Sequence, residues 1–208
     1  MMFGKLFKKS SSKLAIPLEE VRFVVFDTET TGFNYSTDRI LSIGAVEVKD
    51  GRIHLKNSFE VFLQQEKFNP ESVQIHGIIK HHKYKKITEK QAVEQFLVYI
   101  KDAVLVGHHV GYDIKMLNAA LERNAIPPLE NKYIDTNYLF KKTKIINILL
   151  QNDRNYSLDD ICSDLNITPY DRHSAAGDAF LTALAFLKLL GKLSRGKSIT
   201  TLENLLKL

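Results

Sequence analysis

The sequence predicts an α/β domain built on a mixed β-sheet. Three observations lead to this: a near-continuous apolar run at Val21–Phe26, a meander of two further strands behind it, and a change to helical spacing from Ala92 onward. A near-continuous apolar run is typical of a central strand that is buried on both faces, and helices then cover the sheet. At 208 residues the chain suits one domain with a large core.

The meander follows from the order of the strand signals. Val21–Phe26 is rich in β-branched and aromatic residues, Ile40–Val48 is mostly apolar, and Arg52–Leu63 forms a third run. Asp50-Gly51 separates the second and third runs and is a strong hairpin signal. The three runs are therefore expected to lie side by side.

Helices and short strands alternate in the second half of the chain. One apolar helical face is formed by Ala92, Val93, Phe96, Leu97 and Ile100. A short buried strand at Val104–Gly107 precedes a second stripe, made by Ile114, Leu117, Ala120 and Leu121. Proline cannot continue a helix, so Pro127-Pro128 is expected to end this one.

The last third of the chain is predicted in the same way. Ile134 and Asp135 close a final strand, and Ser157 is the N-cap of a helix that runs to Leu165. A long apolar helix is expected at Ser174–Leu190. The remainder is then a loop at 191–196 and a short helix or tail at 199–208. These limits divide the chain into an N-terminal tail (1–20), a main domain (21–190) and a short C-terminal extension (191–208).

The net charge of +5 resides mainly in the first residues of the chain. Lys5, Lys8, Lys9 and Lys13 all precede the first acidic residue, Glu19, and the rest of the chain is nearly balanced. Two basic clusters, 80–86 and 141–144, have two interpretations: phosphate contacts or solvated loops. Charge alone therefore does not identify a function.

Composition narrows the class of protein. The chain has no apolar run of transmembrane length, and its first residues lack the pattern of a secretory signal, so we expect a cytoplasmic protein without a membrane partner. The single cysteine, Cys162, excludes an intramolecular disulfide and suits a reducing compartment. It is expected to be a small buried residue.

Two carboxylates at the end of the first apolar run are the most informative feature. Asp27 and Glu29 are two residues apart, so in a strand they point to the same face. Buried acids are costly unless they are paired or bind a metal. The alternative is a strand end at which both acids face water.

Two further acids fit the same site. Asp113 lies near the start of the predicted second helix, and Asp178 lies within an otherwise apolar helix. Four carboxylates without a cysteine or histidine ligand set favour hard ions, and two Mg²⁺ or Mn²⁺ ions are the usual equipment for phosphoryl chemistry. His173 is the candidate general base, since the pKa of an imidazole is about 6.5. The alternative is an exposed loop histidine.

These motifs resemble those of a known family. The run Phe26–Gly32 with Asp27 and Glu29, the histidine-rich segment that ends in Asp113, and His173-x₄-Asp178 together resemble the three motifs of the DEDDh 3′→5′ exonucleases, in particular the DnaQ-like, epsilon-type proofreading group. The resemblance covers about residues 22–190. It implies an RNase H-like fold, a mixed sheet flanked by helices.

The resemblance also assigns roles to residues. Asp27, Glu29, Asp113 and Asp178 would be metal ligands and His173 the base. Further matching positions would contact the 3′-terminal nucleotide: Thr28, Thr30, Thr31, Gly32, Phe33 as a stacking wedge, Glu71, His76 and, behind the metal ligands, His108.

The implied reaction is removal of 5′-mononucleotides from a single-stranded or mismatched 3′ end, DNA being favoured over RNA. A DNA polymerase subunit is the implied protein partner. Few residues outside the exonuclease motifs are available to bind such a subunit. A stand-alone repair enzyme, an RNA-trimming relative similar to ribonuclease T or oligoribonuclease, and a non-catalytic nucleic-acid-binding module are the alternatives.

Overall fold

The computed structural model describes residues 16–67, 69, 71, 73, 77–78, 84–144, 154–195 and 199–208. Its strands are β1 (Phe23–Thr30), β2 (Ile40–Lys49), β3 (Arg52–Leu63), β4 (Lys86–Ile87), β5 (Val104–Gly107) and β6 (Tyr133–Asp135). Its helices are α2 (Glu89–Ile100), α3 (Gly111–Arg123), α4 (Thr136–Thr143), α5 (Leu158–Asp164), α6 (Ala175–Ser194) and α7 (Leu202–Leu206). Strands and helices thus alternate after β3, as the α/β prediction requires.

The strands form one mixed six-stranded sheet in the order β4-β3-β2-β1-β5-β6. The β1–β2 and β2–β3 pairs are antiparallel, which confirms the meander, whereas β5 pairs in parallel with β1 and β6 in parallel with β5. Asp50 and Gly51 both have positive φ, 52° and 67°, as the predicted two-residue turn between β2 and β3 demands.

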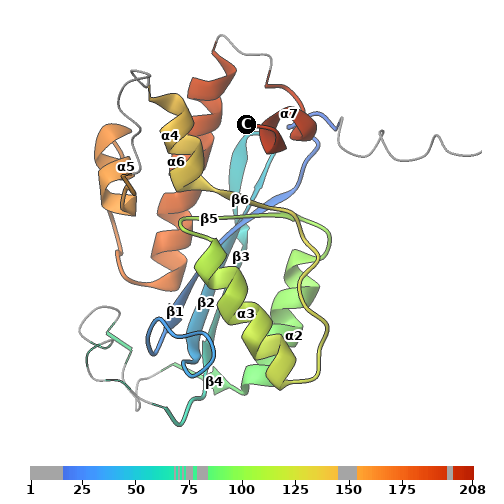
Figure 1. The fold of residues 1–208 in the computed structure, drawn as a ribbon, viewed down its shortest axis with the longest axis vertical. Coiled ribbons are helices and arrows are strands. Elements are labelled where there is room, and N and C mark those ends of the chain that lie inside the picture. Colours follow the sequence, from blue (N-terminus) through green and yellow to red (C-terminus); the bar gives the residue numbers. More distant parts are fainter. Residues whose placement is uncertain are drawn as a thin grey trace, which may run out of the picture.

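The helices cover both faces of the sheet (Figure 1). Side chains of β1 alternate between two cores: Phe23 and Val25 pack with the α4–α7 side, and Val24 and Phe26 pack with α2 and α3. The central strand is therefore buried on both faces, which is why its sequence is apolar without interruption.

Several element limits differ from the expectation. β1 starts at Phe23 and runs on to Thr30, so the two acids lie within the strand and not beyond its end. α3 ends at Arg123, well before the two prolines, where Asn124 caps it. α6 continues to Ser194, so most of the loop expected at 191–196 is helical.

Two elements were not expected at all. β4 is only two residues long and depends on its parallel pairing with the end of β3. α4 begins at an Asp135 N-cap and buries polar residues, Thr136 and Asn137, among its inward positions, so it has no continuous apolar stripe.

Within the described residues no helix is both long and apolar enough to cross a membrane.

The C-terminal segment packs on the same core as the rest of the chain. Leu202 and Leu205 of α7 are buried in the same core cluster as Val21 and Phe23. The segment is also tied to the start of the described chain, because Leu202 N donates to Ile16 O and Leu18 N donates to Thr200 O. Residues 199–208 therefore complete the core of the domain.

Candidate active site

Asp27 and Glu29 lie on the face of β1 that α6 covers. The strand is paired with β2 along its whole length and with β5 over its first residues, so its backbone is held from both sides. Strand alternation places the two acids on one face, as predicted, and both are half-buried. The register shifts between Glu29 and Thr30, and this irregularity marks the end of the site on the strand.

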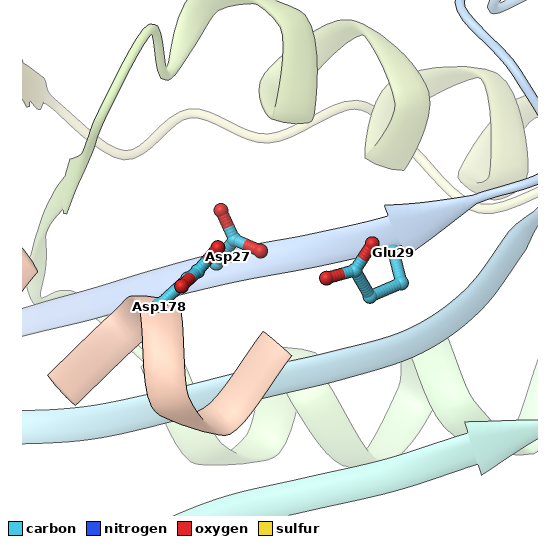
Figure 2. Close-up of side chains that lie close together, drawn as sticks. All are labelled: Asp27, Glu29 and Asp178. Carbon is cyan, nitrogen blue, oxygen red and sulfur yellow. The ribbon is translucent and has the colours of Figure 1, made fainter. Parts of the chain in front are cut away.

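Asp178 approaches the strand from the first turn of α6 (Figure 2). The close packing of α6 depends on Gly44, which pairs with Asp27 across the sheet. A Cβ at Gly44 would lie 2.2 Å from Ala176 N, so only glycine allows the helix to start here. Asp27, Glu29 and Asp178 can each place one carboxylate oxygen within 4.8 Å of the others.

Asp113 reaches the same region from the opposite side of the sheet. It lies in the first turn of α3 and is buried. Its Oδ1 accepts hydrogen bonds from the Thr28 backbone N at 3.1 Å and from Thr28 Oγ1 at 2.6 Å. One carboxylate oxygen is thus used to hold α3 against β1, and the group of three oxygens above does not include Asp113.

The acids are close enough to shift one another's protonation. Burial, and then the charges of the neighbouring acids, raise the pKa of Asp27 well above its usual value and that of Glu29 to about 8. Burial raises the pKa of Asp113 to about 7 despite the hydrogen bonds from Thr28. Such a cluster is unfavourable until a cation compensates it, and an all-oxygen donor set fits Mg²⁺ or Mn²⁺.

His173 lies in the loop that precedes α6 and is exposed. Its φ of 63° lies in the left-handed region, which is uncommon for a residue other than glycine. Ser174 caps the helix, and the His173 backbone N lies 3.4 Å from Asp178 Oδ1. The ring lines the same cleft as the carboxylates.

Arg172 is a residue of this loop that the sequence analysis missed. Its Nη1 donates to Asp178 Oδ1 in a close ion pair. Its Nε and Nη2 donate to the two carboxylate oxygens of Asp159 on α5, at 2.7 and 3.2 Å. Burial opposes the charge of Arg172, but the two acids hold its pKa above the ordinary value. A charged residue directly before the candidate base was the available signal.

The acids and His173 line one cleft of about 380 Å³. The same cleft is lined by Thr28, Thr30, Gly32, Phe33, His108, His109 and Tyr112. Most residues that the sequence suggested are therefore brought together around the carboxylates, and Tyr112 and His109 join them.

His108 lines the cleft and is partly buried. Its Nδ1 is 3.1 Å from Thr136 Oγ1. Burial and the neighbouring His109 lower the pKa of His108 to about 4. At neutral pH this ring is therefore uncharged.

The loop after β1 is built around Asp38. Oδ1 of this carboxylate accepts hydrogen bonds from Thr31 Oγ1 and Lys67 Nζ, and Oδ2 accepts one from the Asn34 backbone N. Thr31 is fully buried and does not line the cleft, whereas Phe33 is 84% exposed at its rim. Thr31 thus shapes the loop that presents Phe33.

The remaining sequence candidates lie elsewhere. Glu71 is exposed, and its backbone N donates to Asn69 Oδ1. His76 and most of the basic cluster at 80–86 lie outside the described residues. In the other cluster, Lys141 and Lys142 are in the last turn of α4, and Lys144 is paired with Asp164. This second cluster is therefore occupied by contacts within the fold.

Comparison with known proteins identifies the family. A family model described as "Exonuclease" (RNase_T) matches residues 24–186. The epsilon subunit of DNA polymerase III from Buchnera aphidicola is 32% identical over 201 residues, which cover 90% of this chain and 81% of that protein. The epsilon subunit from Salmonella typhimurium is 34% identical over 82% of this chain and 72% of its own length.

Longer proteins match over a small part of their length. The PolC-type DNA polymerase III of Thermotoga petrophila is 30% identical over 172 residues, and the chain spans 12% of that polymerase. Among solved structures, E. coli exonuclease I in complex with a dT13 oligonucleotide has a TM-score of 0.72 at 16% identity, over 85% of this chain and 42% of that one. Cell-death related nuclease 4 (CRN-4) has a TM-score of 0.71 at 13% identity, over 88% and 67%. These structures confirm the expected fold.

Proposed function

The chain belongs to the exonuclease family, and on that premise we propose that it removes nucleotides from the 3′ end of single-stranded DNA in a reaction that depends on divalent metal ions. The observation that carries the proposal is the group of three carboxylates within 4.8 Å in a cleft that His173 also lines. A structural role alone gives no reason to gather these like charges at one buried point.

Asp27, Glu29 and Asp178 are the residues that would hold one ion, and Asp113 would help to hold a second. Divalent ions bound there would lower the pKa of the attacking water and stabilise the charge that develops on the leaving oxygen. We propose two ions, Mg²⁺ or Mn²⁺, because the donors are oxygens only.

His173 acts as the general base. Its imidazole takes a proton from the water that attacks the phosphorus of the last phosphodiester, the bond from phosphorus to the 3′-oxygen of the preceding nucleotide breaks, and that oxygen is then protonated. The products are a 5′-mononucleotide and a strand shortened by one. The exposed loop position of His173 suits this role, since the base has to reach over the substrate.

Phe33 supports the choice of a single-stranded substrate. Its ring is 84% exposed at the rim and lies 5.8 Å from the ring of Tyr112, centroid to centroid. An aromatic face holds any unpaired base by stacking, without sequence preference. Thr30 and Gly32 line the cleft between this ring and the acids and would lie along the terminal sugar.

DNA is favoured over RNA because the relatives are named DNA polymerase III subunits and the similar exonuclease I was solved with dT13. We further propose a proofreading role beside a polymerase, in the cytoplasm. Glu71 and His76 remain candidates for holding the terminal nucleotide, and His108 for supporting the site.

The test is hydrolysis of three 5′-labelled substrates with Mg²⁺ or Mn²⁺: single-stranded DNA, a primer–template with a 3′ mismatch, and RNA of the same sequence. We expect a ladder that shortens from the 3′ end, with faster loss of mismatched than of paired termini. Faster RNA cleavage would move the protein to the RNA-trimming group. Absence of cleavage with either ion would contradict the proposed activity.

A further inference from the structure

A groove of about 630 Å³ lies beside the cleft, along the outer face of α3. It is lined by Tyr35 from the loop after β1, by Lys115, Ala119 and Glu122 of α3, and by Ile126 and Pro127 beyond the helix. Neither the carboxylates nor His173 line it, so the proposed reaction does not use it.

The groove and the cleft are built from the same two elements. The loop after β1 places Phe33 at the cleft and Tyr35 at the groove, and α3 places Tyr112 at the cleft and Lys115 at the groove. Lys115 follows Tyr112 by three residues and so lies on the same helical face, roughly 4.5 Å along the axis. A strand that leaves the cleft over Phe33 therefore meets the near end of the groove next.

The near end of the groove carries an exposed aromatic ring and an ammonium group. The Tyr35 side chain is 48% exposed, and Lys115 Nζ lies 5.7 Å from the centroid of its ring. Lys115 Nζ lies over one face of this ring, so the other face remains to stack on a base, and the ammonium attracts the phosphate of the same strand. Glu122 lies two helical turns beyond Lys115, where its charge repels phosphate.

The loop that carries both rings is held in place before any ligand binds. The Asp38 carboxylate accepts hydrogen bonds from Thr31, Asn34 and Lys67. In addition, Tyr112 Oη donates a hydrogen bond to Gly32 O at 2.5 Å. A ring that is already positioned loses little conformational freedom on stacking, so more of the contact contributes to affinity.

We propose that Tyr35 and Lys115 form a second nucleotide subsite, which binds the base and phosphate of a nucleotide upstream of the one that Phe33 contacts. The occupant is the single strand whose 3′ end lies in the cleft, so this inference rests on the proposed function. The subsite makes affinity depend on strand length without acting on the reacting bond.

The test uses 5′-labelled oligothymidylates of increasing length and compares wild type with Tyr35→Ala. In the wild type, KM should fall as the strand becomes long enough to reach the groove. In Tyr35→Ala, KM for long strands should rise roughly 5- to 100-fold, as loss of one base stack implies, while kcat and the KM of the shortest cleaved strand stay unchanged. Tyr138→Ala is the matched control, because Tyr138 is 49% exposed with Lys142 Nζ 4.9 Å from its ring, but it lies on α4.

A second variant tests the phosphate contact. Lys115→Gln should reduce the slope of log(1/KM) against log salt by about 0.7, the value for one contact to a single strand. An unchanged length dependence in Tyr35→Ala, or none in the wild type, would overturn the subsite and leave the groove to a protein partner. If the wild type shortened no oligomer at all, the proposed function itself would fail, which is a different result.

Discussion

Two walls of the cleft, a sheet wall and a loop wall, hold their polar groups by different means. The sheet wall carries Asp27 and Glu29 on β1, which is paired with β2 on one side and β5 on the other. The loop wall carries His173 in a segment with positive φ at both Asp171 and His173. Its polar contacts include the ion pairs that Arg172 makes with Asp159 and Asp178.

The difference shows how a fold can hold like charges together. Ladder hydrogen bonds on β1 fix the separation of the two acids although they repel, and burial together with this repulsion raises their pKa values. The loop wall has few backbone bonds and uses a cation to stay near the acids. Substitutions in the sheet wall should therefore remove chemistry outright, whereas those that loosen the loop wall should reduce it.

Asp27→Ala is the strongest test of the sheet wall. Loss of this carboxylate should lower kcat by ~10³-fold or more, because bound ions contribute several kcal/mol to transition-state stabilisation. The fold should survive, since the change removes a repelling buried charge. Single-turnover rates and circular dichroism check both statements, with exposed Glu94→Ala on α2 as control. Near-normal turnover in Asp27→Ala would remove this residue from the ligand set.

His173→Ala tests the loop wall directly. The rate should fall by roughly 10²–10⁴-fold, the usual contribution of a general base. Binding of Mg²⁺, measured by calorimetry, should stay unchanged, because the carboxylates are intact. A loss of metal affinity equal to that of Asp27→Ala would instead make His173 part of the ion site.

Gly44→Ala tests whether the two walls depend on a fixed spacing. The added Cβ would lie 2.3 Å from the Ala175 carbonyl carbon, so α6 must move away and take Asp178 and the loop with it. We expect the free energy of unfolding to fall by about 1–3 kcal/mol and kcat to fall by ~10-fold or more. Gly191→Ala, at a helical position with open space, is the control: kcat should stay unchanged, and the free energy of unfolding should rise by about 0.5–1 kcal/mol because alanine is the better helix former. Equal behaviour of the two variants would mean that the close approach at Gly44 does not set the site.

Asp159→Asn tests the anchor of the loop wall at a residue that lines no part of the cleft. The Arg172 guanidinium loses its two-point ion pair with α5 and is no longer fixed beside His173. The value of kcat should therefore fall by ~3- to ~10-fold with KM unchanged. The matched control is Asp164→Asn on the same helix, which also breaks ion pairs, with Lys144 and Lys192. Asp159→Glu should recover part of the rate. A fall in kcat/KM caused by a higher KM, with kcat unchanged, would argue for a substrate contact instead of positioning.

The sequence predicted the sheet wall better than the loop wall, for a physical reason. Strand alternation is local, so the common direction of Asp27 and Glu29 could be read from two positions. The fold class, the hairpin at Asp50-Gly51 and the apolar faces of α2 and α6 were likewise local patterns, and the structure confirms them.

Contacts between distant segments could not be read in this way. Arg172 is adjacent to a predicted base, but its partner Asp159 lies on another helix, and only tertiary packing brings the two together. The close approach of α6 to Gly44 is equally non-local. The helix α4 was missed because its buried positions include Thr136 and Asn137, so burial there does not follow hydrophobicity.

The smallest predicted effect is on the pH dependence of stability in the metal-free protein, which should differ between the two walls. The pKa of Glu29 is raised from 4.5 to about 8. Between these values the folded state keeps a proton that the unfolded state has released. The free energy of unfolding should therefore fall as pH rises from about 5 to 8. The pKa of Asp159 is lowered by its hydrogen bonds from Arg172, so its contribution is lost at the other end, as pH falls below its usual range. Thermal melts in EDTA should show a fall of a few degrees toward pH 8 that Glu29→Gln reduces and Asp159→Asn does not. An equal fall in Glu29→Gln would mean that Glu29 does not cause the pH dependence, and would leave it to Asp27 and Asp113, whose pKa values are also raised.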